Sequence, residues 1–251
     1  MNLDLKNKRV LVTGSSRGIG LTIAKAFLTE GCKVIINGRK PISLNKVINT
    51  KENYYKIFGD ITKEDEAHRL IKKSVQLLGG IDIIVCNVGN GTSVIPGKES
   101  RKEWEKMFEI NLFSTTNIVE ASRIHLKKSK GVIICISSIC GSEVIPGAPV
   151  TYSVAKAALN AYIKGISRPL ADDGVKINGV APGNILFSGS VWDKKIKNNS
   201  KLIYKMIDEN VPLKKFGTTK DIANLVLYLA SPLSQFITGS IYHIDGGQTR
   251  S

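Results

Sequence analysis

The 251-residue sequence predicts an α/β fold in which a doubly wound parallel sheet carries helices on both faces. Two observations predict it. Short β-branched runs alternate with amphipathic stretches along the chain, and the runs at 81–89 and 131–138 are apolar at nearly every position, as strands buried on both faces require. No linker, repeat or low-complexity tract interrupts this alternation, so we expect one domain over residues 1–251. Ligands of such sheets bind at the carboxyl ends of the strands, near the switch in strand order.

The first half of the chain carries local signals for its elements. A strand at 8–14 leads through a glycine-rich turn into a helix at 18–31 that Gly31 closes, and a strand at 32–38 follows. We expect a short helix after Pro41. A further strand at 54–60 precedes a helix that ends at Gly79, with Thr62 as its N-cap and Asp65 three residues later.

The second half of the chain alternates in the same way. Ser100 and Glu103 predict a capping box for a long helix that ends near Lys130. The run TYSVAKAALNAYIKG at 151–165 predicts a helix to about Asp172, with Pro169 kinking its last turn. Strands are expected at 81–89, 131–138, 175–183 and 239–247, and a helix at 218–230. The segment 184–215, which has little patterning of its own, is expected to cover a substrate.

Composition excludes several classes of protein. The formal net charge is +15, but the lysines are dispersed and only 6% of residues are aromatic, so no nucleic-acid partner is expected. No apolar run approaches the ~20 residues of a membrane helix, and the N-terminus lacks a signal-peptide layout, so we expect a cytoplasmic protein without a membrane partner. The cysteines form no C-x-x-C pair and the histidines have no metal-binding spacing, which predicts no metal site. The cysteines are Cys32, Cys86, Cys135 and Cys140, and the histidines are His68, His125 and His243.

The stretch TGSSRGIG at 13–20 follows the first strand and opens the first helix. Glycine at such a turn permits tight backbone geometry, lets N–H groups approach a pyrophosphate and lets the helix pack against the strand. A glycine-rich turn without a ligand is the alternative, which the strand-loop-helix context disfavours. The residues expected to contact a dinucleotide here are Gly14, Ser16, Arg17, Gly18, Ile19 and Gly20.

The end of the second predicted strand indicates which dinucleotide binds. An Asp or Glu usually binds a free ribose 2′-hydroxyl there, and Asn37 cannot supply that charge. Arg39, joined by Arg17 from the glycine loop, can bind a 2′-phosphate through charge-assisted hydrogen bonds worth roughly 1.5–3 kcal/mol each. We therefore expect NADP(H) rather than NAD(H). The alternative is that both arginines are solvated.

Tyr152 and Lys156 lie four residues apart in the helix predicted from 151, so they share one of its faces. A Tyr and a Lys at this spacing are common by chance, and the pair alone identifies no chemistry. The motifs in the rest of the chain therefore decide its meaning.

Taken together, the motifs resemble the short-chain dehydrogenase/reductase family over nearly the whole chain. Each motif is weak by itself, but all occur in the family's order and on the expected elements. They are TGSSRGIG (13–20), GDI (59–61), NVG (87–89), Asn111 in EINLFS, ISSICG (136–141), YSVAK (152–156), NGVAPG (178–183) and ITGSIYHIDGG (237–247).

The resemblance implies a Rossmann fold and assigns a role to each matching residue. It makes Tyr152 the catalytic acid/base, Lys156 its partner, Ser138 the residue that holds the substrate oxygen, and Asn111 the support of a proton-relay water. A free phenol has a pKa of about 10, and we expect the nearby ammonium to lower it by ~1–3 units. Further cofactor contacts are implied at Asp60, Ile61, Asn87, Gly89, Pro182, Gly183 and Ile185.

The sequence departs from the family pattern at three places. The loop reads NVGNG where the family usually has Asn-Ala-Gly, and Phe187 stands where the family usually has a carboxamide-binding Thr, with Ser188 adjacent. Pro169 late in the predicted catalytic helix is the third departure, and an extra residue also separates Ser138 from Tyr152. None of these changes touches the four catalytic positions, so they bear on the substrate rather than on the chemistry.

The leading hypothesis is an NADP(H)-dependent oxidoreductase that interconverts a carbonyl and a secondary alcohol, similar to the 3-oxoacyl-acyl-carrier-protein reductases. One alternative keeps this chemistry with a sugar, nucleotide-sugar or polyol as substrate, and another is a non-catalytic dinucleotide-binding regulator. The resemblance suggests a homotetramer. Seven lysines and three acidic residues between 191 and 215 favour an anionic or carrier-bound small-molecule substrate; solvated lysines are the alternative.

Overall fold

Within residues 2–40 and 53–250, which the computed structural model describes, seven parallel strands form one sheet in the order β3-β2-β1-β4-β5-β6-β7. The doubly wound parallel sheet is thus confirmed. The order reverses between β1 and β4, which places the switch point at the carboxyl ends of these strands. The strands are β1 Arg9–Val12, β2 Lys33–Gly38, β3 Tyr54–Phe58, β4 Ile83–Cys86, β5 Val132–Ile136, β6 Lys176–Pro182 and β7 Ile241–Ile244.

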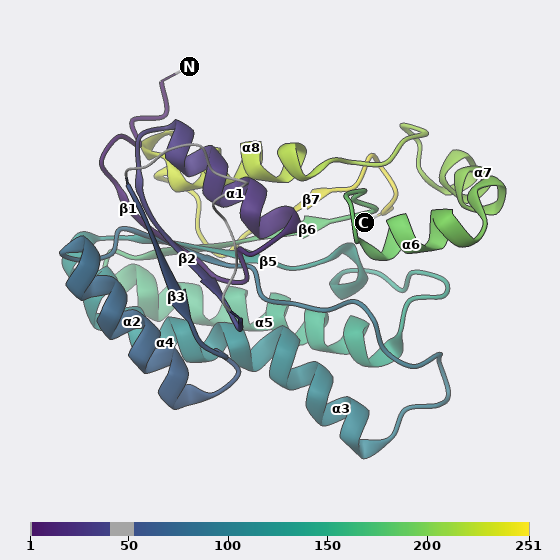
Figure 1. Cartoon of the computed structure of the whole chain (residues 1–251), viewed down its shortest axis with the longest axis horizontal. Coiled ribbons are helices and arrows are strands. Elements are labelled where there is room, and N and C mark those ends of the chain that lie inside the picture. Colours follow the sequence, from purple (N-terminus) through teal and green to yellow (C-terminus); the bar gives the residue numbers. More distant parts are fainter. Residues whose placement is uncertain (1, 41–52, 251) are drawn as a thin grey trace.

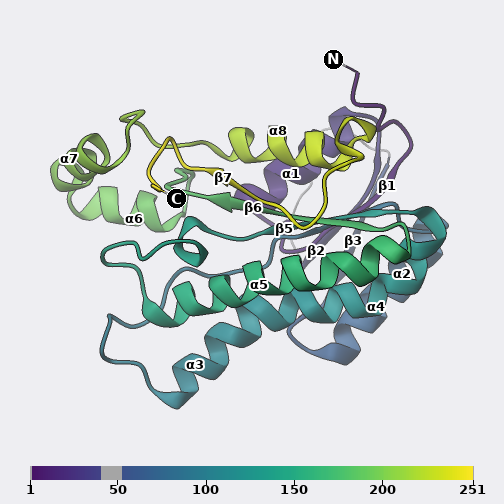
Figure 2. The ribbon, with the colours of Figure 1, turned by 180° about the vertical axis from the view of Figure 1, so that it is seen from behind.

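Helices cover both faces of the sheet (Figure 1, and from behind in Figure 2). On one face lie α1 Gly18–Thr29 and α8 Thr219–Ala230, and on the other lie α2 Glu64–Leu78, α4 Ser114–Ser129 and α5 Val150–Asp172. Alternate residues of a strand point to opposite faces, so Val10 and Val12 join the core under α1 and α8. Leu11 joins the core under the other three helices. Two buried cores explain why the strands read as continuous apolar runs.

The register of the strands brings their carboxyl ends to one edge of the sheet. Val12 pairs with Val85, Ile136 with Val180, and Pro182 with Ile244. The segments that follow β1, β4, β5 and β6 therefore emerge side by side. These segments contain the glycine loop and most of the residues predicted to bind the cofactor.

The long helix predicted from 100 to about 130 is interrupted. It consists of α3 Arg101–Phe108, a π-helical turn at Glu109–Phe113, and α4. The Ser100 hydroxyl accepts a hydrogen bond from the Glu103 N–H, as predicted. The Glu103 carboxylate, however, accepts hydrogen bonds from Ser93 and Lys106 rather than closing a capping box.

Two local predictions concern the chain between β2 and α2. The prediction of Thr62 as the N-cap of α2 is wrong, because the helix begins at Glu64 after Lys63. The Thr62 hydroxyl and N–H both donate to the Asp60 carboxylate, which holds Thr62 in a turn before the helix. The short helix expected after Pro41 falls on residues 41–52, outside the described part of the chain.

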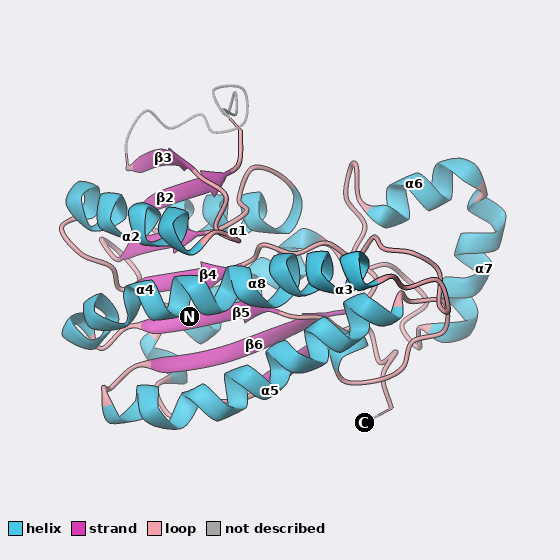
Figure 3. Cartoon of the chain, turned by 90° about the horizontal axis from the view of Figure 1, so that it is seen from below, coloured by secondary structure: helices cyan, strands magenta, loops and turns pink. Residues whose placement is uncertain are grey.

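The segment 184–215, for which the sequence predicts no elements, contains α6 Val191–Asn198 and α7 Ser200–Asn210. Both have side-chain N-caps, since Ser190 accepts from Asp193 N–H and Asn199 accepts from Leu202 N–H. The two helices stand beyond the carboxyl edge of the sheet, apart from the layers (Figure 3). Among the described residues no helix has the length and apolarity that a membrane span requires.

Candidate active site

The glycine loop between β1 and α1 has the features of an anion-binding turn. Gly14 and Gly18 both have positive φ, +59° and +55°, a conformation that side chains disfavour. Within the described part of the chain no side chain caps the N-terminus of α1, and its first turn holds no acidic residue. Its backbone N–H groups and the positive end of the helix dipole are therefore suited to a phosphate or pyrophosphate.

Two side-chain amides, one of them the buried Asn37, hold this loop from either side. The Asn87 side chain, just beyond β4, donates to the carbonyls of Thr13 and Gly14, both at 3.1 Å. A Cβ at Gly20 would collide with that same Asn87 amide nitrogen, so only glycine fits there. On the other side, Asn37 Oδ1 lies 3.4 Å from the Gly14 nitrogen. Asn87, predicted to line the cofactor, thus also fixes the conformation of the loop.

The predicted 2′-phosphate ligands lie in different surroundings. Asn37 is buried and its amide donates to the carbonyls of Ile57 and Gly59, so it supports the strand ends. Arg39 is exposed one residue beyond β2. Arg17 is also exposed, and its guanidinium donates to the Gly189 carbonyl at 3.4 Å, which directs it toward the segment that precedes α6.

Phe187 lies against the glycine loop. A Cβ at Gly18 would be 2.5 Å from Cε2 of the Phe187 ring. The ring of Phe187 therefore covers the start of α1 with an apolar surface where the family pattern has a hydroxyl.

Asn111 lies in the π-helical turn, fully buried. Its Oδ1 accepts from Asn90 N–H at 3.0 Å, and its Nδ2 donates to the carbonyls of Asn90 and Met107. A Cβ at Gly89 would lie 3.1 Å from Asn111 Oδ1 and 3.3 Å from Lys156 Nζ. The Asn111 amide and the Lys156 amine therefore both lie close to Gly89 in the loop after β4.

The remaining catalytic candidates meet at the same place. Lys156 is buried, and its Nζ donates to the Ile136 carbonyl at the end of β5 at 2.8 Å. Ser138 is buried two residues further, and its hydroxyl accepts from Cys140 N–H at 3.2 Å. Gly91 packs on Tyr152, since a Cβ there would be 3.6 Å from Cζ of the ring. The structure therefore brings Asn111, Ser138, Tyr152 and Lys156 together beside the glycine loop.

The predicted effect of Lys156 on Tyr152 is wrong in this structure. Burial raises the pKa of Tyr152 to about 12, and the hydrogen bond with Ser138 opposes this only in part. Burial also lowers the pKa of Lys156 to about 8. The Lys156 amine is turned to the Ile136 carbonyl, and the loss of hydration dominates both groups. At neutral pH the phenol is protonated, and most Lys156 amines are charged.

The other predicted cofactor residues line the carboxyl edge. Asp60 follows β3 and Ile61 is buried beside it. Gly183 donates its N–H to the Ile244 carbonyl, and a Cβ there would meet Asp245 at 2.7 Å. Ile185 is buried and bridges to Gly217, which joins the start of the covering segment to the residues before α8.

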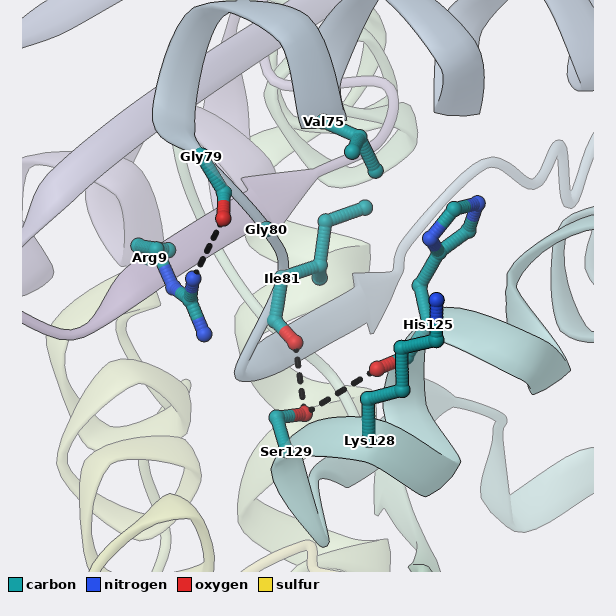
Figure 4. A pocket seen from close by; sticks show the side chains of 8 residues that line it. All are labelled: Arg9, Val75, Gly79, Gly80, Ile81, His125, Lys128 and Ser129. Atoms are coloured by element: carbon teal, nitrogen blue, oxygen red, sulfur yellow. Dashed lines mark hydrogen bonds between the residues drawn. The ribbon is translucent and has the colours of Figure 1, made fainter.

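A hollow lies at the opposite edge, where β1 and β4 begin (Figure 4). Arg9, Gly80, His125 and Lys128 are among its lining residues, and none of the catalytic candidates reaches it. Among the described residues no group of three or more His, Cys, Asp or Glu side chains is placed to bind a metal ion.

Sequence reasoning missed two residues of the site. Asn90 is bonded in both directions to Asn111, and the unusual NVGNG loop is the available signal for it. Gly91, which contacts the Tyr152 ring, belongs to the same loop. The role of Asn90 depends on a π-helical turn that no sequence pattern indicates.

Comparison with known proteins places the chain among oxidoreductases. A family model described as enoyl-(acyl carrier protein) reductase matches residues 14–249. The 3-oxoacyl-[acyl-carrier-protein] reductase of Aquifex aeolicus is 34% identical over 98% of this chain and 99% of its own length. Glucose 1-dehydrogenase of Gluconobacter oxydans is 33% identical over 96% of this chain and 92% of its own length. The structure of L-sorbose reductase from Gluconobacter frateurii, complexed with NADPH and L-sorbose, superposes with a TM-score of 0.93 at 25% identity, and the match covers all of both chains.

The buried Lys156 amine predicts a pH-dependent stability. Its pKa is lowered to about 8 in the folded chain, against an ordinary value of 10.5, so between these values the unfolded state binds more protons and stability rises with pH. We expect wild type to gain up to about 3 kcal/mol in unfolding free energy relative to Lys156→Met across this window. Denaturant titrations of both proteins at pH 7.5, 9 and 10.5 measure it. Parallel changes in the two proteins would contradict the burial of this amine.

Proposed function

The chain belongs to the short-chain dehydrogenase/reductase family, and from this premise we propose that it is an NADP(H)-dependent oxidoreductase that interconverts a carbonyl and a secondary alcohol. One observation carries the proposal: Ser138, Tyr152 and Lys156 meet beside an uncapped glycine-rich helix N-terminus. The residues around that N-terminus fit a dinucleotide. We further propose a single dinucleotide-binding and catalytic domain located in the cytoplasm.

Each side chain has a distinct role in the proposed reaction. When bound, NADPH supplies a hydride to the carbonyl carbon. The Ser138 hydroxyl orients the substrate oxygen, and the protonated phenol of Tyr152 transfers its proton to that oxygen as negative charge develops. The Lys156 amine, which donates to the Ile136 carbonyl, holds the helix that carries Tyr152 against the end of β5. Asn111 holds the Asn90 backbone and so fixes the loop that passes Lys156 at Gly89.

The proposed proton donor is tested by Tyr152→Phe. General acid/base catalysis is worth roughly 10²–10⁴ in rate, so turnover should fall by that factor while NADPH binding stays intact. Stopped-flow absorbance with a panel of ketones measures the rate, and NADPH fluorescence measures binding. Tyr162→Phe is the matched control, since it lies on the same helix and its hydroxyl has no hydrogen-bond partner among the described residues. A Tyr152→Phe variant that keeps more than about a tenth of the activity would contradict the assignment.

The preference for NADP(H) rests on Arg39 and Arg17. Arg39 is exposed just beyond β2, and the buried Asn37 offers no carboxylate to a ribose 2′-hydroxyl. We expect a higher kcat/KM with NADPH than with NADH. Arg39→Ala should weaken NADPH binding about tenfold or more and leave NADH binding nearly unchanged. Arg101→Ala, an exposed arginine on α3, is the control. Equal kcat/KM values for the two cofactors in wild type would refute the preference.

The substrate is the finer part of the proposal. The names of the similar proteins give a 3-oxoacyl group on acyl-carrier protein, glucose and L-sorbose, so the likeness favours no single substrate. We place an anionic or carrier-bound 3-oxoacyl substrate first and a sugar or polyol second. The covering segment supports this order, because its charge is only partly neutralised. Lys197, Lys205 and Lys214 form ion pairs within the segment, while Lys194, Lys195, Lys201 and Lys215 form none among the described residues.

This charge predicts a salt-dependent rate. Unneutralised lysines attract anions over a distance that added salt shortens, so kcat/KM for an anionic ketone should fall more steeply with ionic strength than for a neutral one. Changing Lys194→Glu and Lys195→Glu together should abolish the difference. The adjacent pair Lys72→Glu and Lys73→Glu on α2 makes the same charge change elsewhere and should preserve it. Equal salt dependence for both ketones in wild type would mean that the lysines play no steering role.

We also propose a homotetramer that pairs through α4 and α5. Ile124 on α4 is 62% exposed, and Ala157 and Ala161 are exposed on α5, so both helices present apolar surface to solvent. Multi-angle light scattering at micromolar concentration should show four chains, and Ala161→Glu should lower the mass by burying a charge at the contact. A stable wild-type monomer would overturn this proposal.

A non-catalytic dinucleotide-binding regulator is the alternative function. NADPH binding without turnover of any carbonyl compound in the panel would favour it over the enzyme.

A further inference from the structure

The segment that carries Ser138 is joined to α5 through one carboxamide. Asn160 lies on α5, four residues beyond Lys156 and eight beyond Tyr152, so all three share a face of the helix. It is 8% exposed. A buried carboxamide on the catalytic face has no part in the reaction proposed above and calls for another role.

Its hydrogen bonds reach both sides of Ser138. Asn160 Oδ1 accepts from the buried Ser137 hydroxyl at 2.5 Å, and Asn160 Nδ2 donates to the Ser142 hydroxyl at 3.4 Å. The Ser142 hydroxyl in turn lies 2.7 Å from Nε2 of His243 on β7. The amide therefore connects α5, the end of β5, the turn that follows and the last strand.

The turn after Ser138 fits tightly against the same helix. A Cβ at Gly141 would lie 2.6 Å from the backbone carbon and 2.7 Å from the carbonyl oxygen of Lys156. Two further side chains on this face of α5 reach the segment: Lys156 bonds the Ile136 carbonyl, and Tyr152 shares a hydrogen bond with Ser138. Lys156 and Tyr152 are both proposed to act in the reaction. Asn160 instead connects α5 to this segment without taking part in the reaction.

We propose that Asn160 is a positioning residue that fixes the Ser138 hydroxyl relative to the Tyr152 phenol. The expected effect on kcat rests on the proposed function. The expected effect on the position of Ser138 rests on geometry alone. A displacement of about 1 Å in a reacting group costs on the order of 10² in rate, so loss of the Asn160 hydrogen bonds should lower kcat measurably.

Asn160→Ala tests the kinetic consequence. We expect kcat to fall at least about tenfold, while the dissociation constant of NADPH changes less than about twofold, because the glycine loop is untouched. Asn178→Ala is the matched control: this buried amide on β6 bonds Ile237 and Ser240, away from Ser138. If the control lowers kcat as much as Asn160→Ala, the effect is general destabilisation and the proposal is wrong.

A double-mutant cycle identifies the partner. Ser137→Ala removes the other half of the bond, so the single variants and the Ser137→Ala, Asn160→Ala protein should all lose a similar factor in kcat. Losses that multiply would show that the two residues act independently and would overturn the proposal.

Hydrogen–deuterium exchange tests the geometry without reference to activity. In Asn160→Ala, the amides of residues 137–142 should exchange faster, including the Cys140 N–H that donates to Ser138, while Asn178→Ala leaves them unchanged. Unchanged exchange in Asn160→Ala would refute the positioning role, whether or not the enzyme turns over. If wild type reduces no carbonyl compound but the exchange result holds, the proposed function fails and the positioning of Ser138 stands.

Discussion

The hydrogen bond from the Lys156 amine to the Ile136 carbonyl is the interaction on which the geometry of the site depends. It joins α5, which carries Tyr152, to the end of β5, which leads to Ser138. Removing an ammonium from water is costly, and the lowered pKa of Lys156 reflects that cost. The rest of the core must therefore hold this amine in place, and the loop at Gly89 packs within reach of it from the other side.

The cofactor side of the site is packed just as closely. The Asn87 amide binds two carbonyls of the glycine loop, and it leaves no room for a side chain at Gly20. Phe187 also approaches Gly18 closely. Glycine in this loop therefore serves two needs at once: it allows the positive φ of the turn, and it lets side chains from distant segments touch the backbone. Phe187 places an aromatic ring, in the position where the sequence resemblance predicts a hydroxyl, against the start of α1.

The raised pKa of Tyr152 and the lowered pKa of Lys156 have one main cause, which is burial. A protonated phenol beside a mostly charged amine suits the donation of a proton to a carbonyl oxygen at neutral pH. The spacing of Tyr152 and Lys156 on one helix predicts that the ammonium dominates the phenol. Burial dominates instead, because both groups lose hydration and the amine is directed at a backbone carbonyl.

The alternation of strands and helices is readable from the chain alone, since apolar runs and amphipathic periods are local properties. The glycine loop and the shared face of Tyr152 and Lys156 are readable for the same reason, because both follow from spacing within one element. Other features depend on tertiary packing. The Thr62 hydroxyl can serve either the helix or Asp60, and the geometry of the turn selects Asp60. The π-helical turn that aims Asn111 at Asn90, and the Asn160 network with Ser137 and Ser142, join residues 18 to 23 positions apart. Such contacts depend on how buried elements pack, and packing has no local period that a sequence can display.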